Sequence, residues 1–164
     1  MSKKYLVISD THGRHTNLQR VLEKVGPLDG VFHLGDIEGG QAYIEQLLSC
    51  PLYLVAGNND FYSDAPKELT LRLEGQTFFL THGHRQQVYY GTDRLYYAGL
   101  AAGADVILYG HTHYPMKEYE GKVLILNPGS LSLPRQPGRR PTYAILEIDR
   151  FGELHATLNE LNDE

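Results

Sequence analysis

Short apolar segments alternate with amphipathic segments through the first third of the chain, and this order constrains the fold more than any other feature. Segments 5–9, 31–34 and 52–55 have the length and continuous hydrophobicity of strands buried on both faces. Between them, segments 18–25 and 41–49 place apolar side chains at helical spacing. Strands that alternate with helices predict a parallel sheet built from βαβ units.

Hairpins are expected in the second half of the chain. Strand-type segments lie on both sides of three glycine-containing turns, at 74–76, 120–122 and 149–152. A further apolar strand is expected at 106–109 and a third helix at 92–102. We therefore expect an α/β fold in which two sheets pack face to face with helices outside. The hairpin strands are expected at 69–73 and 77–80, at 116–119 and 123–126, and at 142–148 and 153–159.

The composition indicates a single domain over residues 1–164, because 41% of the residues are hydrophobic and the chain is long enough to bury a core. The net charge of -5 argues against general nucleic-acid binding. The one cysteine, Cys50, excludes an intramolecular disulfide and suits a reducing compartment. No apolar segment approaches the roughly 20 residues of a membrane span. We therefore expect a cytoplasmic protein that does not enter a membrane.

Polar side chains follow the apolar strands, and the histidines after segment 106–109 show this pattern most clearly. His111 and His113 are two residues apart, and in extended backbone such side chains point to the same side. Imidazole is the commonest metal ligand among side chains, although an isolated pair of this kind is more often two exposed loop histidines. The pattern recurs after other strands, and this recurrence favours a metal site. The candidate ligands are Asp10, His12, Asp36, Asn58, His82, His111 and His113.

These donors are oxygen and nitrogen atoms without a thiolate, which suits divalent Mn, Fe, Co, Ni or Zn. Seven ligands are too many for one catalytic ion with an open position, but they suit two ions that share a carboxylate. Two dications ~3.5–4 Å apart form a clamp for in-line displacement at phosphorus. Their repulsion is on the order of 20 kcal/mol at an effective dielectric constant of about 20. With only Asp10 and Asp36 as charged ligands, such a site would stay positive and attract an anion.

The order and spacing of these motifs resemble the calcineurin-like metallophosphoesterases over nearly the whole chain. The short length and the Asn-Pro-Gly-Ser segment at 127–130 are most similar to the small single-domain bacterial and archaeal phosphodiesterase branch. A eukaryotic retromer subunit shares the fold of that branch. The matching motifs are D-x-H at 10–12, G-D at 35–36, G-N at 57–58, H-G-H at 82–84 and G-H-T-H at 110–113.

The resemblance implies a four-layer α/β/β/α sandwich of two mixed sheets flanked by helices. It also implies two metal ions, with a metal-bound hydroxide as the nucleophile, and Mn²⁺ is the first expectation. Asp36 would bridge the ions and is therefore a predicted catalytic residue. One ion would take Asp10, His12, Asp36 and His113, and the other would take Asp36, Asn58, His82 and His111.

Asn59 is a departure from the family pattern, because many members carry histidine there as a general acid or phosphate contact. An amide cannot give a proton to a leaving oxygen, but it can hydrogen-bond to a phosphate oxygen. Asn59 is therefore a predicted catalytic and substrate-binding position with a restricted role. Asp60 keeps the acidic residue of the family and is expected to orient the loop. His84 is a candidate substrate contact, with a solvated side chain as the alternative.

The resulting prediction is a binuclear phosphodiesterase that acts on a small phosphoester. The alternatives are a non-catalytic scaffold of the retromer-subunit type and a phosphomonoesterase, and the number of subunits stays open. Tyrosines at 89, 90, 96 and 97 could stack an aromatic ligand or pack a helix or a second subunit. The remaining expectations are a capping box at Thr16 and Gln19, a core or ligand-supporting His33, surface positions for His15 and His155, and a solvated loop around Arg135.

Overall fold

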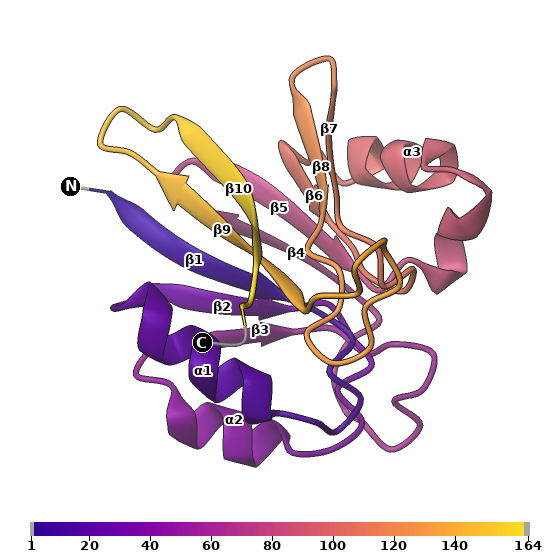
Figure 1. Cartoon of the computed structure of the whole chain (residues 1–164). Helices are drawn as coiled ribbons and strands as arrows, with labels where there is room; N and C mark the ends of the chain where they lie inside the picture. The colour runs from indigo at the N-terminus through magenta and orange to yellow at the C-terminus, as the bar shows by residue number, and fades with distance from the viewer. Residues whose placement is uncertain (1, 163–164) are drawn as a thin grey trace.

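The first three apolar segments form neighbouring parallel strands, as their alternation with helices predicts. In the computed structural model, which describes residues 2–162, β1 (Lys3–Ile8) pairs in parallel with β2 (Gly30–His33). The β2 strand pairs in parallel with β3 (Leu52–Leu54). The last two strands, β9 (Thr142–Ile148) and β10 (Leu154–Glu160), complete the sheet antiparallel on the other side of β1. The strand order is therefore β10-β9-β1-β2-β3 (Figure 1).

The second sheet has a parallel centre with an antiparallel strand at each edge. The parallel strands are β5 (Gln76–Thr81), β6 (Val106–Leu108) and β8 (Val123–Asn127). The edge strands are β4 (Glu68–Leu73), which pairs with β5, and β7 (Met116–Glu120), which pairs with β8. The order is β4-β5-β6-β8-β7, and all three predicted hairpins are confirmed.

Helices cover the outer faces of the two sheets. Figure 1 shows α1 (Thr16–Val25) and α2 (Gln41–Leu47) beside the first sheet and α3 (Asp93–Ala101) beside the second. Two short 3₁₀ turns, His84–Gln86 and Val88–Tyr90, precede α3. The layers are therefore α/β/β/α, which confirms the predicted fold class.

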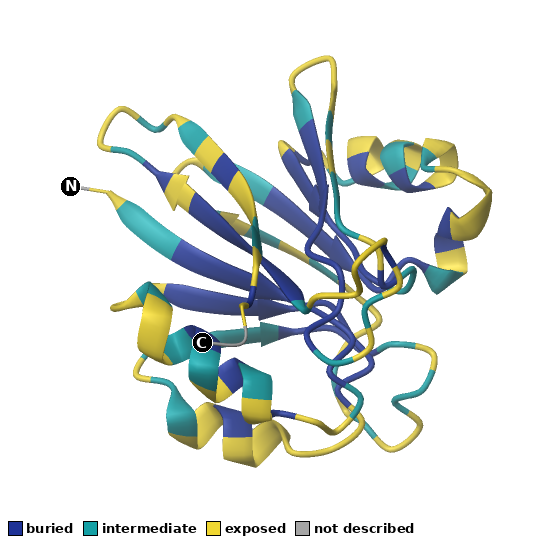
Figure 2. Ribbon diagram, in the orientation of Figure 1, coloured by how far each residue is buried: buried dark blue, intermediate teal, exposed yellow. Residues whose placement is uncertain are grey.

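Three apolar clusters fill the spaces between these layers and explain the continuous hydrophobicity of the central strands. Val7 of β1 packs between the sheets, whereas Leu6 and Ile8 pack toward α1 and α2. Phe32 and Phe78 stack across the two sheets with their ring centroids 5.2 Å apart. Figure 2 shows the central strands buried and the outer ends of the edge strands exposed.

Two local details differ from expectation. Thr16 and Gln19 form no capping box, because His15 is the N-cap of α1 and no side chain caps that end. His15 is buried rather than on the surface, because its Nε2 donates to the carbonyl of Gly39 at 2.9 Å. His155 is exposed, as predicted. No helix within residues 2–162 has both the length and the apolar character needed to cross a membrane.

Replacing Phe32, whose ring stacks on Phe78 of the other sheet, should destabilise the whole fold. Phe32 has no exposed surface, so Phe32→Ala should lower the free energy of unfolding by about 3–5 kcal/mol through lost burial and a cavity. Urea denaturation of both proteins measures this difference. The matched control is Phe151→Ala, because Phe151 is 76% exposed at a hairpin turn and should change stability by less than about 0.5 kcal/mol. Equal losses in the two variants would contradict the proposed core.

Candidate metal centre

Asp10 lies at the middle of the candidate site, two residues beyond the end of β1, and has no exposed surface. Its Oδ2 accepts hydrogen bonds from the hydroxyl of Ser9 at 2.6 Å and from the backbone N–H of His111 at 3.0 Å. Its Oδ1 is buried without a hydrogen-bond partner within the described residues. Three imidazole nitrogens surround that oxygen: Nε2 of His113 at 3.3 Å, of His12 at 3.7 Å and of His82 at 3.7 Å.

Asp36 is the second carboxylate of the site. Its Oδ1 accepts the backbone N–H of Asn59 at 2.9 Å, and its Oδ2 accepts the side-chain amide of Asn59 at 3.0 Å. The same Oδ2 lies 3.3 Å from Nε2 of His82 and 3.9 Å from Nε2 of His12. Burial alone would raise the pKa of Asp36, but the bonds and charge of His82 and the bonds of Asn59 hold that pKa below its ordinary range. Asp36 is therefore ionised and faces both histidines.

Hydrogen bonds made by Nδ1 of three histidines determine which ring nitrogen faces the candidate metal centre. In each ring Nδ1 donates to an oxygen that can only accept, so a neutral ring carries its lone pair on Nε2. The acceptors are the carbonyl of Leu34 for His82 at 2.7 Å, the carbonyl of Leu133 for His113 at 2.6 Å, and the carboxylate of Glu38 for His12.

This arrangement turns lone pairs toward one another. In the neutral rings of His12 and His113, the two Nε2 atoms lie 3.1 Å apart with their lone pairs facing each other. Nδ1 of His111 lies 3.2 Å from Nε2 of His82, and one of these two rings can donate to the other. Two facing lone pairs are unfavourable unless a cation or a proton lies between them. Together with the unpartnered oxygen of Asp10, they form a donor set that fits divalent cations.

The ligand atoms divide into two overlapping groups, each within 4.8 Å of one another. One group is Asp10, His12 and His113, and the other is Asp10, Asp36 and His82. Asp10 belongs to both groups, and Asp36 faces histidines of both. A centre with two ions can therefore use either carboxylate between them.

Asn58 differs from the other six candidate ligands. Its side chain is exposed and makes no hydrogen bond within residues 2–162. The neighbouring Asn59 instead contacts Asp36 through both its backbone and its side chain. The structure thus brings together six of the seven candidate ligands, and the role of Asn58 stays a prediction.

The backbone at the site is strained and does not have the extended form that the sequence argument assumed. His111 and His113 have positive φ angles of 73° and 60°, so the turn itself, rather than strand alternation, directs both rings inward. Positive φ is uncommon for residues other than glycine and clusters at functional sites. Asp10, His12 and Asp36 share it, with φ of 55°, 49° and 56°.

Two glycines leave room for the carboxylates. A Cβ atom on Gly110 would lie 2.1 Å from the Ser9 hydroxyl and 2.7 Å from Oδ2 of Asp10. A Cβ atom on Gly57 would lie 2.2 Å from Oδ1 of Asp36. Gly110 and Gly57 therefore allow the close packing of these loops around the two carboxylates.

Asp60 holds the two loops that carry Asp36 and Asn59. Its carboxylate accepts four backbone N–H groups, from Asp36, Ile37, Glu38 and Gly57, at 2.7, 3.4, 2.8 and 2.8 Å. This confirms that Asp60 orients the loop. The contact of Glu38 with His12 was not anticipated, and its position two residues after Asp36 was the only signal in the sequence.

The two remaining histidine candidates, His33 and His84, lie in different environments. His33 is fully buried, accepts the Gly35 N–H at Nδ1, and burial lowers its pKa to about 4, so it is a neutral core residue. His84 is half-buried, with its ring 5.5 Å from that of His82 and 6.0 Å from that of His111.

Tyr89 is the one of the four predicted tyrosines that contacts a candidate ligand. Its ring meets that of His111 edge to face at 4.8 Å, and its hydroxyl donates to the His111 carbonyl at 3.2 Å. Arg135 donates to the same hydroxyl at 2.5 Å. Arg135 is therefore exposed but held at the rim of the site rather than free in a loop.

Comparison with known proteins identifies the family. A model of the calcineurin-like phosphoesterase superfamily domain matches residues 4–150. The chain belongs to this superfamily. The probable metallophosphoesterase YsnB of Bacillus subtilis is 35% identical over 147 residues, which cover 88% of this chain and 83% of that protein. The phosphodiesterase YfcE of Escherichia coli is 40% identical over 77 residues, 47% of this chain and 38% of that protein.

Solved structures of the superfamily share the fold. A predicted phosphoesterase of Streptococcus pneumoniae aligns with a TM-score of 0.80 and 32% identity, covering 98% of this chain and 99% of that chain. Vacuolar protein sorting 29 structures from several eukaryotes align at TM-scores of 0.68 to 0.78. Their identities of 16% to 23% show the fold alone.

The donor set predicts about two divalent ions per chain after reconstitution. Asp36→Asn should reduce the metal content strongly, because it removes a charge that faces both histidine groups. Elemental analysis of dialysed protein measures the ratio, and metal-dependent thermal stabilisation gives a second readout. The control is Asp149→Asn, which alters a carboxylate of the exposed group Asp149, Glu153 and His155. Trace metal in the folded wild type would contradict the site.

Proposed function

We propose that this protein is a metal-dependent phosphodiesterase that acts on small phosphoesters in the cytoplasm. The observation that carries the proposal is the buried Oδ1 of Asp10, which lacks a partner while three imidazole nitrogens face it. A buried carboxylate oxygen with this environment fits a bound divalent cation. Family membership supports phosphoester hydrolysis as the chemistry.

Two ions are proposed, with Mn²⁺ first and Fe, Co, Ni or Zn as alternatives. When bound, they would activate a water molecule for attack on phosphorus and neutralise the charge that develops there. Asn58 is kept among the proposed metal ligands because the adjacent residue, Asn59, contacts Asp36. One ion would be held by Asp10, His12, Asp36 and His113, and the other by Asp36, Asn58, His82 and His111.

The protein residues around the ions would orient the substrate and limit its leaving group. Asn59 lies beside Asp36 and can donate hydrogen bonds to a phosphate oxygen, but it has no acidic proton to give to a departing alkoxide. His84 is proposed as a second substrate contact because its Nδ1 is buried without a partner within the described residues. These features favour diesters that have weakly basic leaving groups, and the name of the Escherichia coli relative supports a diesterase.

A non-catalytic scaffold is the second candidate, and the fold shared with vacuolar protein sorting 29 favours it. A scaffold does not need strained ligand loops or a carboxylate oxygen buried without a partner. The two candidates are separated by activity in the presence and absence of a chelator. A manganese-reconstituted protein that leaves every diester intact would support the scaffold.

The identity of residue 59 should control the range of leaving groups. Asn59→His would introduce a proton donor, and general acid catalysis typically contributes ~10²–10⁴-fold. We therefore expect a larger increase in kcat/KM for an alkyl diester than for an aryl diester, because the aryl oxide leaves without a proton. The measurement compares an aryl diester, an alkyl diester and an alkyl monoester at saturating manganese.

A matched substitution separates this effect from a change in Asp36. Asn59→Gln keeps an amide and should not raise the rate on the alkyl diester. If Asn59→His changes all three substrates equally, or slows all three, residue 59 does not occupy the position of an acid. Asn59 would then serve only to hold Asp36 and contact phosphate.

A further inference from the structure

A cavity of about 520 Å³ opens between the loop after β2 and the turn after β3. Glu38, Gly39 and Gly40 line it on one side, and Asn59, Phe61 and Tyr62 line it on the other. No role in binding or catalysis has been assigned above to Phe61, Tyr62 or the two glycines. The cavity is large enough for a planar ring.

The cavity shares two residues with the surroundings of the candidate metal centre. Asn59 donates from its side chain to Oδ2 of Asp36 at 3.0 Å. Glu38 accepts a hydrogen bond from Nδ1 of His12. A group attached to a phosphate at the metal centre would pass Asn59 and Glu38 to reach this cavity.

The two sides of the cavity are held at a fixed separation. The Asp60 carboxylate accepts backbone N–H groups from Ile37 and Glu38 on one loop and from Gly57 on the other. Behind the glycines, the ring of His15 fills the space, because a Cβ atom on Gly40 would lie 2.7 Å from its Nε2. A preformed cavity loses less free energy to ordering when a ligand binds.

The chemistry of the cavity suits a flat aromatic ring. Phe61 is 80% exposed and Tyr62 is 101% exposed, so both rings have faces free to stack. Gly39 and Gly40 present backbone without side chains on the facing loop. Aromatic side chains stack on any planar base or aryl ring through their π-faces.

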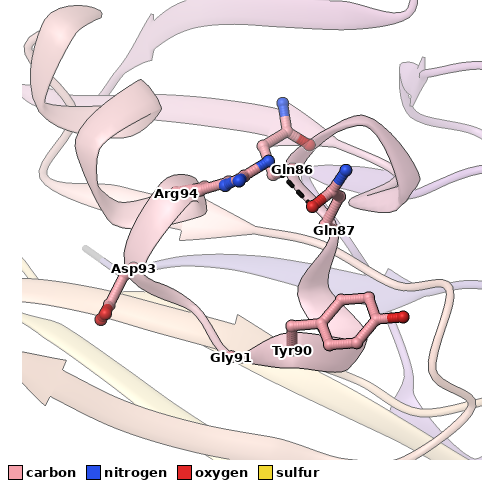
Figure 3. Close-up of a pocket in the computed structure, with 6 residues that line it drawn as sticks. All are labelled: Gln86, Gln87, Tyr90, Gly91, Asp93 and Arg94. Atoms are coloured by element: carbon pink, nitrogen blue, oxygen red, sulfur yellow. Dashed lines mark hydrogen bonds between the residues drawn. The ribbon is translucent and has the colours of Figure 1, made fainter.

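A second cavity of similar size lies beside α3 and does not share these properties. It is lined by Gln86, Gln87, Tyr90, Gly91, Asp93 and Arg94 (Figure 3). Arg94 donates to Gln87 at 2.8 Å across it. None of the six is a candidate metal ligand, so no binding role is proposed for this cavity. Tyr90 in its lining therefore serves as a control position.

We propose that the cavity between Gly39–Gly40 and Phe61–Tyr62 binds an aromatic ester arm of the substrate, either a nucleobase or an aryl ring. The inference rests on the proposed function, because the phosphate of the same substrate must lie at the metal centre. Phe61 and Tyr62 are then specificity-determining residues, and they take no part in bond breaking.

Binding is tested without turnover through a fluorescent reporter. The chain contains no tryptophan, so Phe61→Trp places a single indole in the cavity, and Phe151→Trp places one at a similarly exposed turn. The probes are AMP and phenyl phosphate, with ribose 5-phosphate and methyl phosphate as controls that lack an aromatic ring, all at one fixed metal loading. We expect saturable changes in emission only for Phe61→Trp with the two aromatic probes.

The two aromatic probes also show whether the cavity prefers a nucleobase or an aryl ring. A response to AMP at lower concentration indicates a nucleobase, and a response to phenyl phosphate at lower concentration indicates an aryl group. Equal responses to aromatic and non-aromatic phosphates, or no response at all, would overturn the inference.

Kinetics supply the second arm of the test. The substrates are p-nitrophenyl diesters whose other arm is methyl, phenyl or thymidine, so the leaving group stays constant. Phe61→Ala with Tyr62→Ala should raise KM for the phenyl or thymidine diester by roughly fivefold to 30-fold, within the range known for aromatic stacking. The methyl diester carries only the p-nitrophenyl ring that all three substrates share, so its KM should change less than that of the other two. The control pair is Phe151→Ala with Tyr90→Ala, whose rings are 76% and 91% exposed.

Failure of this inference is distinct from failure of the proposed function. If wild type hydrolyses the diesters but the double variant shows no selective loss, the metal centre stands and the cavity has no role in specificity. If wild type hydrolyses none of them while the Phe61→Trp emission still responds to aromatic phosphates, the cavity binds such ligands in a protein that is not a diesterase.

Discussion

The structure depends on a buried carboxylate that joins the functional edges of the two sheets. Asp10 follows a strand of the first sheet, and its Oδ2 accepts the backbone N–H of His111, which follows a strand of the second. The same residue gives its backbone carbonyl to the hydroxyl of Ser130 at 2.7 Å. One residue therefore joins three loops from distant parts of the sequence through its side chain and its backbone, while Oδ1 of its carboxylate faces the candidate metal centre.

The strained backbone around Asp10 follows from the same constraint. Left-handed conformations at residues other than glycine persist only where the surrounding structure over-determines them. Here the four N–H groups bound by Asp60, the close approach at Gly57 and Gly110, and the outer hydrogen bonds of the histidines supply that determination. These contacts are all made by protein groups, and they would hold the loops in place around bound ions.

The likeness to vacuolar protein sorting 29 shows why the fold alone does not decide the activity. Proteins at 16% to 23% identity share the two-sheet architecture with this chain. What bears on function is the local chemistry at the strand ends, where three imidazole nitrogens surround a buried Asp10 oxygen that has no hydrogen-bond partner among the described residues. Selectivity among substrates depends on still more local features, such as the amide at Asn59 and the rings of Phe61 and Tyr62.

The sequence by itself determined the order of helices and strands, the two-sheet sandwich and the set of candidate ligands. It could do so because apolar periodicity is local, and because parallel strands bring their carboxyl ends to one edge. Only the tertiary structure decided that His111 and His113 converge through left-handed turns, that Glu38 supports His12, that His15 is buried, and that Asn59 rather than Asn58 contacts Asp36. Each of these depends on contacts between loops, whose backbone angles are set by neighbours distant in sequence rather than by adjacent residues.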